Sequence, residues 1–179
     1  MDHHDHVNLL RPASLDKGGS WADLGAGSGA FTLALREVIG AATTIHAVDK
    51  DKSSLAQLKQ AYQTRFGNTD NLQIQVGDFS RVVELPPLDG IIAANSLHYF
   101  KDRVKILEHI KSLLKPNGKL IVIEYNVDSG NPWVPYPFTF QTFGKLAKQS
   151  GFTEPQLLAT HPSSFLREFY SALTFKADS

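Results

Sequence analysis

A glycine-rich run is the part of the sequence whose residues are best suited to chemistry. Asp23-Leu24-Gly25-Ala26-Gly27-Ser28-Gly29 directly follows an expected strand and opens an expected helix. Gly25 and Gly27 let the backbone turn sharply and approach a ligand without a Cβ in the way. Because a helix start also offers unpaired N–H groups, this strand–loop–helix context predicts a nucleotide site. The alternative is that Gly27 and Gly29 serve only close strand–helix packing.

Two acidic residues stand at the ends of the next two expected strands. Asp49 closes Ile45-His46-Ala47-Val48-Asp49, where its carboxylate can accept both hydroxyls of a ribose. Asp78, within Val76-Gly77-Asp78-Phe79, stands where it can meet an adenine amino group. Ligands of open parallel sheets bind outside the carboxyl ends of the strands. We therefore expect the glycine turn and both acids to converge on one adenosine.

The same glycines also fit a dinucleotide fingerprint. The run matches G-x-G-x-x-A, ending at Ala30, and Asp49 follows about 20 residues later. An NAD-type oxidoreductase is therefore an alternative. Three features weigh against it: Asp23 before the glycines, the second acid Asp78, and a chain too short to add a catalytic domain.

The elements that must position these residues alternate between strands and helices. Short apolar runs bounded by turn residues predict five strands, at Ser20–Leu24, Thr43–Val48, Leu72–Val76, Leu88–Ala94 and Lys119–Glu124. Apolar stripes between them predict three helices: Phe31 to Val38 before Gly40, Leu55 to Tyr62 after Asp51, and Val104 to Leu114 from near Asp102. Ser80–Glu84 has room only for a short helix. This order predicts a three-layer, doubly wound α/β fold with a mostly parallel sheet.

The carboxy-terminal part follows a different pattern. Thr139–Ser150, closed by Gly151, predicts a helix, and Gln156–Thr160 and Phe165–Lys176 predict two strands. Their four-residue link, His161–Ser164, permits only a hairpin. The sheet should therefore have seven strands, with an antiparallel last strand. We expect one domain over 1–179, with a capping segment at 1–19 and a loop rich in proline and aromatic residues at 126–142.

Composition excludes several classes of function. The chain has 179 residues, no cysteine, and 18 basic against 18 acidic residues. Without cysteine there is no disulfide framework and no thiolate metal site, and a neutral chain is unlike a nucleic-acid surface. No apolar run reaches the length needed to cross a bilayer, and no signal peptide is evident. We expect a cytoplasmic protein with no nucleic-acid or membrane partner, active as a monomer or homodimer.

Taken together, these motifs resemble the class I S-adenosylmethionine-dependent methyltransferases, and the resemblance covers nearly the whole chain. Those enzymes share the seven-stranded sheet with its antiparallel last strand. Five motifs match in order: the glycine run, Asp49 with Lys50, Asp78 with Phe79, Ala94-Asn95-Ser96-Leu97-His98, and the turn Leu114–Leu120.

The resemblance implies a cofactor, S-adenosylmethionine, with S-adenosylhomocysteine as product, and a role for each matching position. Gly25 through Gly27 would face its methionine and ribose, Phe79 would flank the adenine, and the backbone around Asn95 would hold the ammonium. The cofactor residues expected on this basis are Asp23, Gly25, Ala26, Gly27, Asp49, Lys50, Gly77, Asp78, Phe79 and Asn95.

Methyl transfer from a sulfonium demands no metal and no oxyanion hole, so orientation can supply most of the rate. A base is needed only when the acceptor is protonated. His98, just past the fourth strand, is the candidate catalytic base; the alternative is an ordinary polar loop residue. No metal site is expected: His3, His4 and His6 resemble a metal tract, but a flexible or capping terminus is the preferred interpretation.

The acceptor must be recognised by segments that cover the strand ends. The loop after the fifth strand supplies Tyr125, Trp133 and Tyr136 among prolines, and these predict a stiff aromatic substrate wall, or else a structural connection. The absence of cysteine excludes acceptors attacked or bound through thiolates. We therefore predict a methyltransferase acting on a small molecule by in-line transfer. The alternatives are the oxidoreductase and a non-catalytic S-adenosylmethionine-binding protein.

Overall fold

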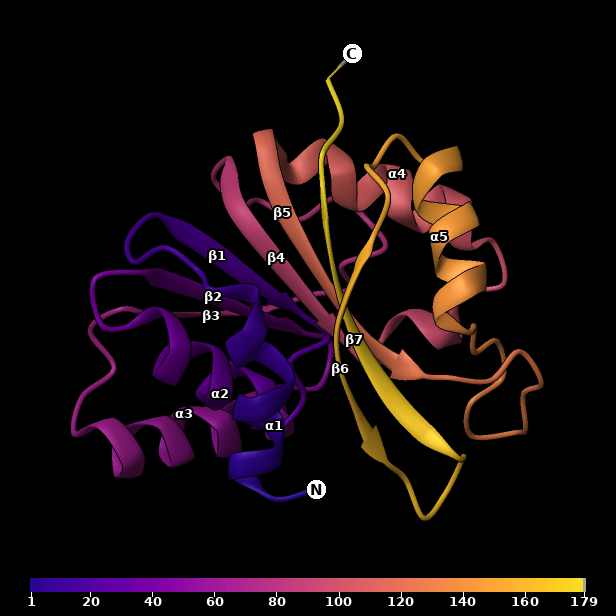
Figure 1. Cartoon of the computed structure of the whole chain (residues 1–179). Coiled ribbons are helices and arrows are strands. Elements are labelled where there is room, and N and C mark those ends of the chain that lie inside the picture. The colour runs from indigo at the N-terminus through magenta and orange to yellow at the C-terminus, as the bar shows by residue number, and fades with distance from the viewer. Residues whose placement is uncertain (179) are drawn as a thin grey trace.

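A seven-stranded sheet organises the computed structural model, which describes residues 1–178 (Figure 1). The strands lie in the order β3-β2-β1-β4-β5-β7-β6. Their bounds are β1 Ser20–Leu24, β2 Thr44–Asp49, β3 Leu72–Val76, β4 Leu88–Ala94, β5 Leu114–Tyr125, β6 Gln156–Pro162 and β7 Glu168–Phe175. The first five strands pair in parallel, whereas β7 is antiparallel to both β5 and β6. The predicted fold class is therefore confirmed.

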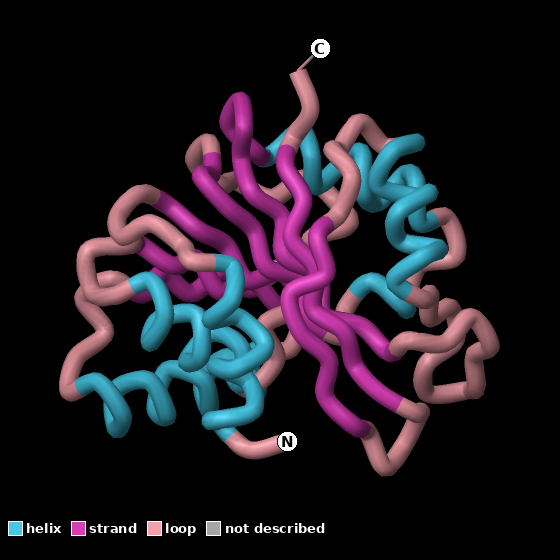
Figure 2. Tube along the Cα trace, in the orientation of Figure 1, coloured by secondary structure: helices cyan, strands magenta, loops and turns pink. Residues whose placement is uncertain are grey.

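Helices cover both faces of this sheet (Figure 2). They are α1 His3–Leu10, α2 Ala30–Ile39, α3 Lys52–Phe66, α4 Arg103–Leu113 and α5 Phe140–Gln149, with short 3₁₀ turns η1 Arg11–Ala13 and η2 Leu97–Tyr99. Helices α1, α2 and α3 lie on one side and α4 and α5 on the other (Figure 1). Alternate residues of a strand point to opposite faces, so Ile121 packs in the α1–α2 core and Val122 in the α4–α5 core.

The predicted helix starts and ends agree closely with the structure. Asp51 caps α3 by accepting a hydrogen bond from the backbone N–H of Ser53, and Asp102 caps α4 in the same way. Thr139 caps α5, and Gly40 ends α2. Each of these signals works within one turn of helix, because the cap satisfies N–H groups that have no intrahelical partner.

The amino-terminal segment is a structured part of the fold. Asp2 and Asp5 form a reciprocal capping box at the start of α1, and Val7, Leu9 and Leu10 are buried. The helix packs on α2 and β6. One of its histidines is engaged locally, since Nε2 of His3 lies 2.6 Å from a carboxylate oxygen of Glu37. The segment therefore covers the edge where β6 and the α2 layer meet.

Three boundaries differ from the prediction. Ser80–Glu84 forms turns and irregular chain instead of a short helix. The turn at 116–118 lies inside β5 as an irregularity, because Leu88 pairs with Leu114 and Gly90 pairs with Lys119. The hairpin link is 163–167, because β6 continues to Pro162 and β7 begins only at Glu168. In the last two cases, pairing with a neighbouring strand moved an end that local turn residues had suggested.

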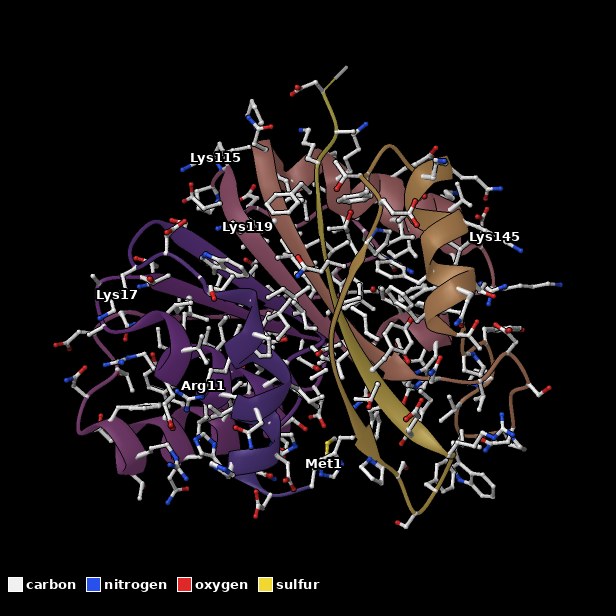
Figure 3. All side chains as sticks on the ribbon, viewed as in Figure 1. Met1, Arg11, Lys17, Lys115, Lys119 and Lys145 are labelled. Carbon is white, nitrogen blue, oxygen red and sulfur yellow. The ribbon has the colours of Figure 1, made fainter. Side chains whose placement is uncertain are left out.

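The two ends of the parallel strands carry different groups. Lys115 and Lys119 lie in the amino-terminal part of β5, on the side of the molecule opposite Met1 (Figure 3), where they pair with Asp89 and Asp16. The carboxyl ends of the parallel strands, where ligands bind in such sheets, lie on the other side. Within residues 1–178, no helix is long and apolar enough to cross a membrane.

Candidate functional site

A cavity of about 640 Å³ opens at the carboxyl ends of the first four strands. Eight of the ten predicted cofactor residues line it: Gly25, Gly27, Asp49, Lys50, Gly77, Asp78, Phe79 and Asn95. Ser96, Tyr99 and Phe100 complete the wall. The motifs lie far apart in the chain, and the parallel sheet brings them to one place.

The glycine loop has the tight geometry that its sequence predicted. Gly25 has φ +80°, and a Cβ there would lie 2.6 Å from Cβ of Ser96, so no larger residue fits without movement. Gly27 also has a positive φ, of +54°, but a Cβ there would meet nothing within 4 Å. The Gly27 backbone therefore borders open space at the cavity. Close packing therefore requires a glycine at Gly25.

Asp49 is held rigidly at the end of β2. One carboxylate oxygen accepts the backbone N–H of Gly27 at 2.8 Å, and the other accepts that of Asp51 at 2.8 Å. A carboxylate has about four acceptor positions. The Asp49 oxygens can thus accept further hydrogen bonds from a ligand while the loop stays in place.

Asp78 and Phe79 follow β3 on the opposite wall. The side-chain hydroxyl and the backbone N–H of Ser80 donate to Asp78, and these hydrogen bonds hold the pKa of that carboxyl below its usual value. Phe79 packs edge-on against Phe100, with ring centroids 5.5 Å apart. This wall therefore presents an ionised acid beside an aromatic surface.

Asn95 and Ser96 present polar atoms without partners. Asn95 has φ +52°, uncommon for a residue with a side chain, and its backbone N–H donates to the carbonyl of Ile123. Within the described part of the chain, Asn95 Oδ1 and Ser96 Oγ are buried without a hydrogen bond. Buried polar atoms normally have partners. These two atoms, on residues that line the cavity, can bind a polar ligand group.

Asp23 and Ala26, the other two predicted cofactor residues, do not line the larger cavity. They line a smaller cavity of about 190 Å³ with His6 of α1, and Gly25 and Asn95 border both cavities. Thr32 donates to Asp23 at 2.6 Å. Burial raises the pKa of Asp23 to about 7, although the Thr32 hydrogen bond opposes this shift. Asp23 therefore keeps its proton to a higher pH than Asp78, whose pKa is lowered.

His98 lies just past β4 as predicted, but it is buried and does not stand on an open rim. Its side chain is only 2% exposed, and Nδ1 lies 2.8 Å from Oε2 of Glu124, which is fully buried. Oε1 of Glu124 accepts the backbone N–H groups of Leu97 and His98. Among the described residues, Nε2 of His98 has no hydrogen-bond partner. The neighbouring Tyr99 lines the larger cavity.

The predicted substrate residues lie outside the cofactor-side cavity. The ring centroid of Tyr125 is 6.1 Å from that of His98, whereas Trp133 and Tyr136 are 71% and 38% exposed. Tyr136 contacts the His98 segment through its backbone, since its N–H donates to the His98 carbonyl at 2.8 Å. The loop is therefore fastened beside His98, and its aromatic side chains lie further out.

Sequence reasoning missed Glu124 and Phe165. Glu124 interrupts the apolar run Leu120–Ile123 at the end of β5, and a carboxylate in such a run was the available signal. Phe165 was assigned to a strand, but it lies in the turn between β6 and β7 and contacts Trp133. Within residues 1–178, no group of three or more histidine or acidic side chains is placed to hold a metal ion.

Two known proteins are similar to this chain in sequence. The chain is 29% identical to an arsenite methyltransferase of Aquipseudomonas alcaligenes over 175 residues, 87% of this chain but only 50% of that enzyme. A segment of 36 residues, 20% of this chain and 1% of the relative, is 58% identical to a highly reducing polyketide synthase of Leptosphaeria maculans. The chain thus spans half or less of these two relatives.

Solved structures match almost end to end. The YcgJ protein of Bacillus subtilis superposes with a TM-score of 0.78 at 14% identity, over 99% of this chain and all of that one. Magnesium protoporphyrin IX methyltransferase from Synechocystis, with bound S-adenosylmethionine, gives 0.72 at 16% identity, over 98% and 78%. The family model described as a methyltransferase domain matches residues 15–161. The chain therefore belongs to the methyltransferase domain family, whose cofactor is S-adenosylmethionine.

Proposed function

We propose that this chain transfers a methyl group from S-adenosylmethionine to a small molecule whose reacting O–H or C–H must lose a proton. The observation that carries this proposal is the buried His98–Glu124 pair directly beside the cavity that collects the cofactor motifs. A cofactor cavity alone explains binding. A histidine held by a buried carboxylate adds a group that can accept a proton.

The residues around the cavity fit the cofactor. Asp49 has free acceptor capacity for the ribose hydroxyls, and Asp78 and Phe79 offer an acid and a ring for the adenine. The unpartnered Oδ1 of Asn95 suits the ammonium of the methionine part. We assign Asp23 and Ala26, which line the smaller cavity, a role in holding the glycine loop in place. Lys50 and Gly77 form part of the wall of the larger cavity.

When bound, S-adenosylmethionine supplies a methyl group on a sulfonium, and its loss leaves S-adenosylhomocysteine. The work of this chain is to orient the acceptor and to take its proton. Because the Glu124 carboxylate can only accept a hydrogen bond, it fixes the proton of a neutral His98 on Nδ1 and leaves the lone pair on Nε2. Nε2 is buried in this structure, and it is the atom that would take the acceptor's proton once a bound acceptor reaches it. General-base catalysis of this kind contributes about 10²–10⁴ in rate.

The acceptor class rests on the chain's own residues. The arsenite methyltransferase supports a small acceptor, but this chain has no cysteine and therefore no thiolate to hold arsenic. Ribosomal protein L11 methyltransferases also match, at 29% identity over 55% of this chain. An acceptor panel must therefore include a protein. The neutral net charge gives no indication of a nucleic-acid acceptor.

The experiment has two stages. Thermal unfolding is followed with S-adenosylhomocysteine and with NAD: ligand at about 100 times its Kd should stabilise the fold by about 2.7 kcal/mol, and we expect this only with the former. Transfer of a labelled methyl group is then measured to phenols, to β-diketones and to ribosomal protein L11. Stabilisation by NAD alone would support an oxidoreductase, and binding without transfer to any acceptor would indicate a non-catalytic protein.

A further inference from the structure

Three aromatic side chains form a row that runs from the buried His98 to the surface. The ring of Tyr125 lies 6.1 Å from that of His98 and 6.0 Å from that of Phe165, and Phe165 lies 6.5 Å from Trp133. Phe169 supports Tyr125 from β7 at 4.3 Å. Exposure increases along the row, since Tyr125 is partly buried, Phe165 is 51% exposed and Trp133 is 71% exposed. We call Tyr125, Phe165 and Trp133 the aromatic track.

The turn that carries Phe165 is fixed by its own hydrogen bonds. The hydroxyl oxygen of Ser163 accepts the backbone N–H groups of Phe165 and Leu166, and the Ser163 N–H donates to the carbonyl of Arg167 at 2.8 Å. Arg167 closes the turn with φ +52°. The hydrogen bonds of this turn therefore hold Phe165 in its exposed position.

The loop that carries Trp133 is fixed as well. The side-chain oxygen of Asn131 accepts the backbone N–H groups of Trp133 and Val134, and Val134 is buried beneath the loop. In Figure 1 the loop after β5 lies at the lower right and the β6–β7 turn lies at the bottom. Two segments about 30 residues apart thus converge, each presenting an exposed aromatic ring next to the other.

Exposed apolar side chains that adjoin one another indicate a binding surface, whereas exposed apolar residues scattered singly need no explanation. We propose that the methyl acceptor is an acidic small molecule with an apolar tail, and that this tail lies along the aromatic track while the acidic end lies at its inner end, beside Tyr125 and towards His98. Phe165, from the β6–β7 turn, decides which tails are accepted. The inference rests on the proposed function for the acidic end only, since the track itself binds the tail.

The test is equilibrium dialysis with S-adenosylhomocysteine present, using 2,4-alkanediones and 4-alkylphenols of increasing chain length as probes. Each CH₂ that is buried should tighten binding about fourfold, since burial of one CH₂ contributes about 0.8 kcal/mol. Phe165→Ala and Trp133→Ala should flatten this dependence on chain length. The two probe series distinguish a carbon acid from a phenol as the acidic end.

Controls separate this inference from the proposed function. Leu157→Ala removes another exposed apolar side chain, 45% exposed at the far end of β6, and should change nothing. Phe165→Leu should restore part of the chain-length dependence. Binding of S-adenosylhomocysteine should be the same in all variants. If the unmodified chain did not bind S-adenosylhomocysteine, that result would count against the proposed cofactor site and not against the aromatic track. Affinities that are absent, independent of chain length, or unchanged in Phe165→Ala would overturn the aromatic track.

Discussion

The Nδ1 atom of His98 lies 2.8 Å from Oε2 of Glu124, and neither side chain has appreciable contact with solvent. The pairing follows from sheet register: Ala94 of β4 lies opposite Ile123 of β5, so the residues just beyond them meet where β4 ends. Glu124 also accepts two backbone N–H groups from the segment that carries His98. One carboxylate therefore sets both the path of that segment and the orientation of the imidazole.

His98→Ala is expected to lower kcat for methyl transfer by about 10²–10⁴, the usual contribution of a general base. The Kd of S-adenosylhomocysteine should stay nearly the same, because His98 does not line the cavity proposed for the cofactor. Glu124→Gln should also reduce kcat, since the amide no longer fixes the tautomer. Steady-state kinetics and calorimetry measure both effects, and His161→Ala is the control. An unaltered kcat in His98→Ala would remove the base from the mechanism.

Asp49→Asn is expected to weaken binding of S-adenosylhomocysteine about 10- to 100-fold, as a hydrogen bond to a charged group contributes about 1.5–3 kcal/mol. The amide also cannot accept from both Gly27 and Asp51. Titration calorimetry gives the Kd. Asp51→Asn is the matched control, because Asn caps a helix as well as Asp. Equal affinities in the two variants would contradict a role for Asp49 at the ribose.

Asp23→Asn should change how stability depends on pH. Burial raises the pKa of Asp23 from 3.8 to about 7, so the folded chain holds a proton that the unfolded chain releases. Stability from this group is complete below about pH 4 and is lost as pH rises towards 7, by about 4 kcal/mol in all. The amide does not ionise. The free energy of unfolding of the variant, relative to that of the unmodified chain, should therefore rise by about 3 kcal/mol as the pH increases from 5 to 8.

Urea unfolding at several pH values measures this difference for Asp23→Asn. Asp78→Asn is its control, because the pKa of Asp78 is lowered and its contribution changes only below about pH 4. Between pH 5 and pH 8 the Asp78 variant should therefore differ from the unmodified chain by a constant amount. A constant difference for Asp23→Asn as well would show that Asp23 is ionised throughout this range.

Gly25→Ala should destabilise the fold more than Gly67→Ala. Both glycines have φ +80°, but only at Gly25 would the new Cβ meet Ser96, at 2.6 Å. The positive φ alone costs about 1–2 kcal/mol, and the contact at Gly25 adds to this. Thermal unfolding and S-adenosylhomocysteine titration check both variants. We expect Gly67→Ala to bind normally and Gly25→Ala to lose affinity; matching results for the two would assign the effect to backbone strain.

The sequence by itself determined the strand and helix order, the glycine turn, the helix caps and the cofactor-side motifs. Asp51 and Thr139 cap helices through hydrogen bonds to residues two or three positions away, so short patterns carry the information. Asp49 and Asp78 needed only one further rule, that parallel strands end at the same edge. Eight of the ten predicted cofactor positions then met in one cavity.

Only the tertiary structure decided how distant segments meet. His98 and Glu124 are 26 residues apart and Trp133 and Phe165 are 32 residues apart, and no local spacing relates either pair. The first pair depends on the register between β4 and β5, and the second on where the β6–β7 turn falls after β7 pairs with β5. Register is set by the burial of whole strands against two helix layers, so these contacts exist only once the sheet has formed.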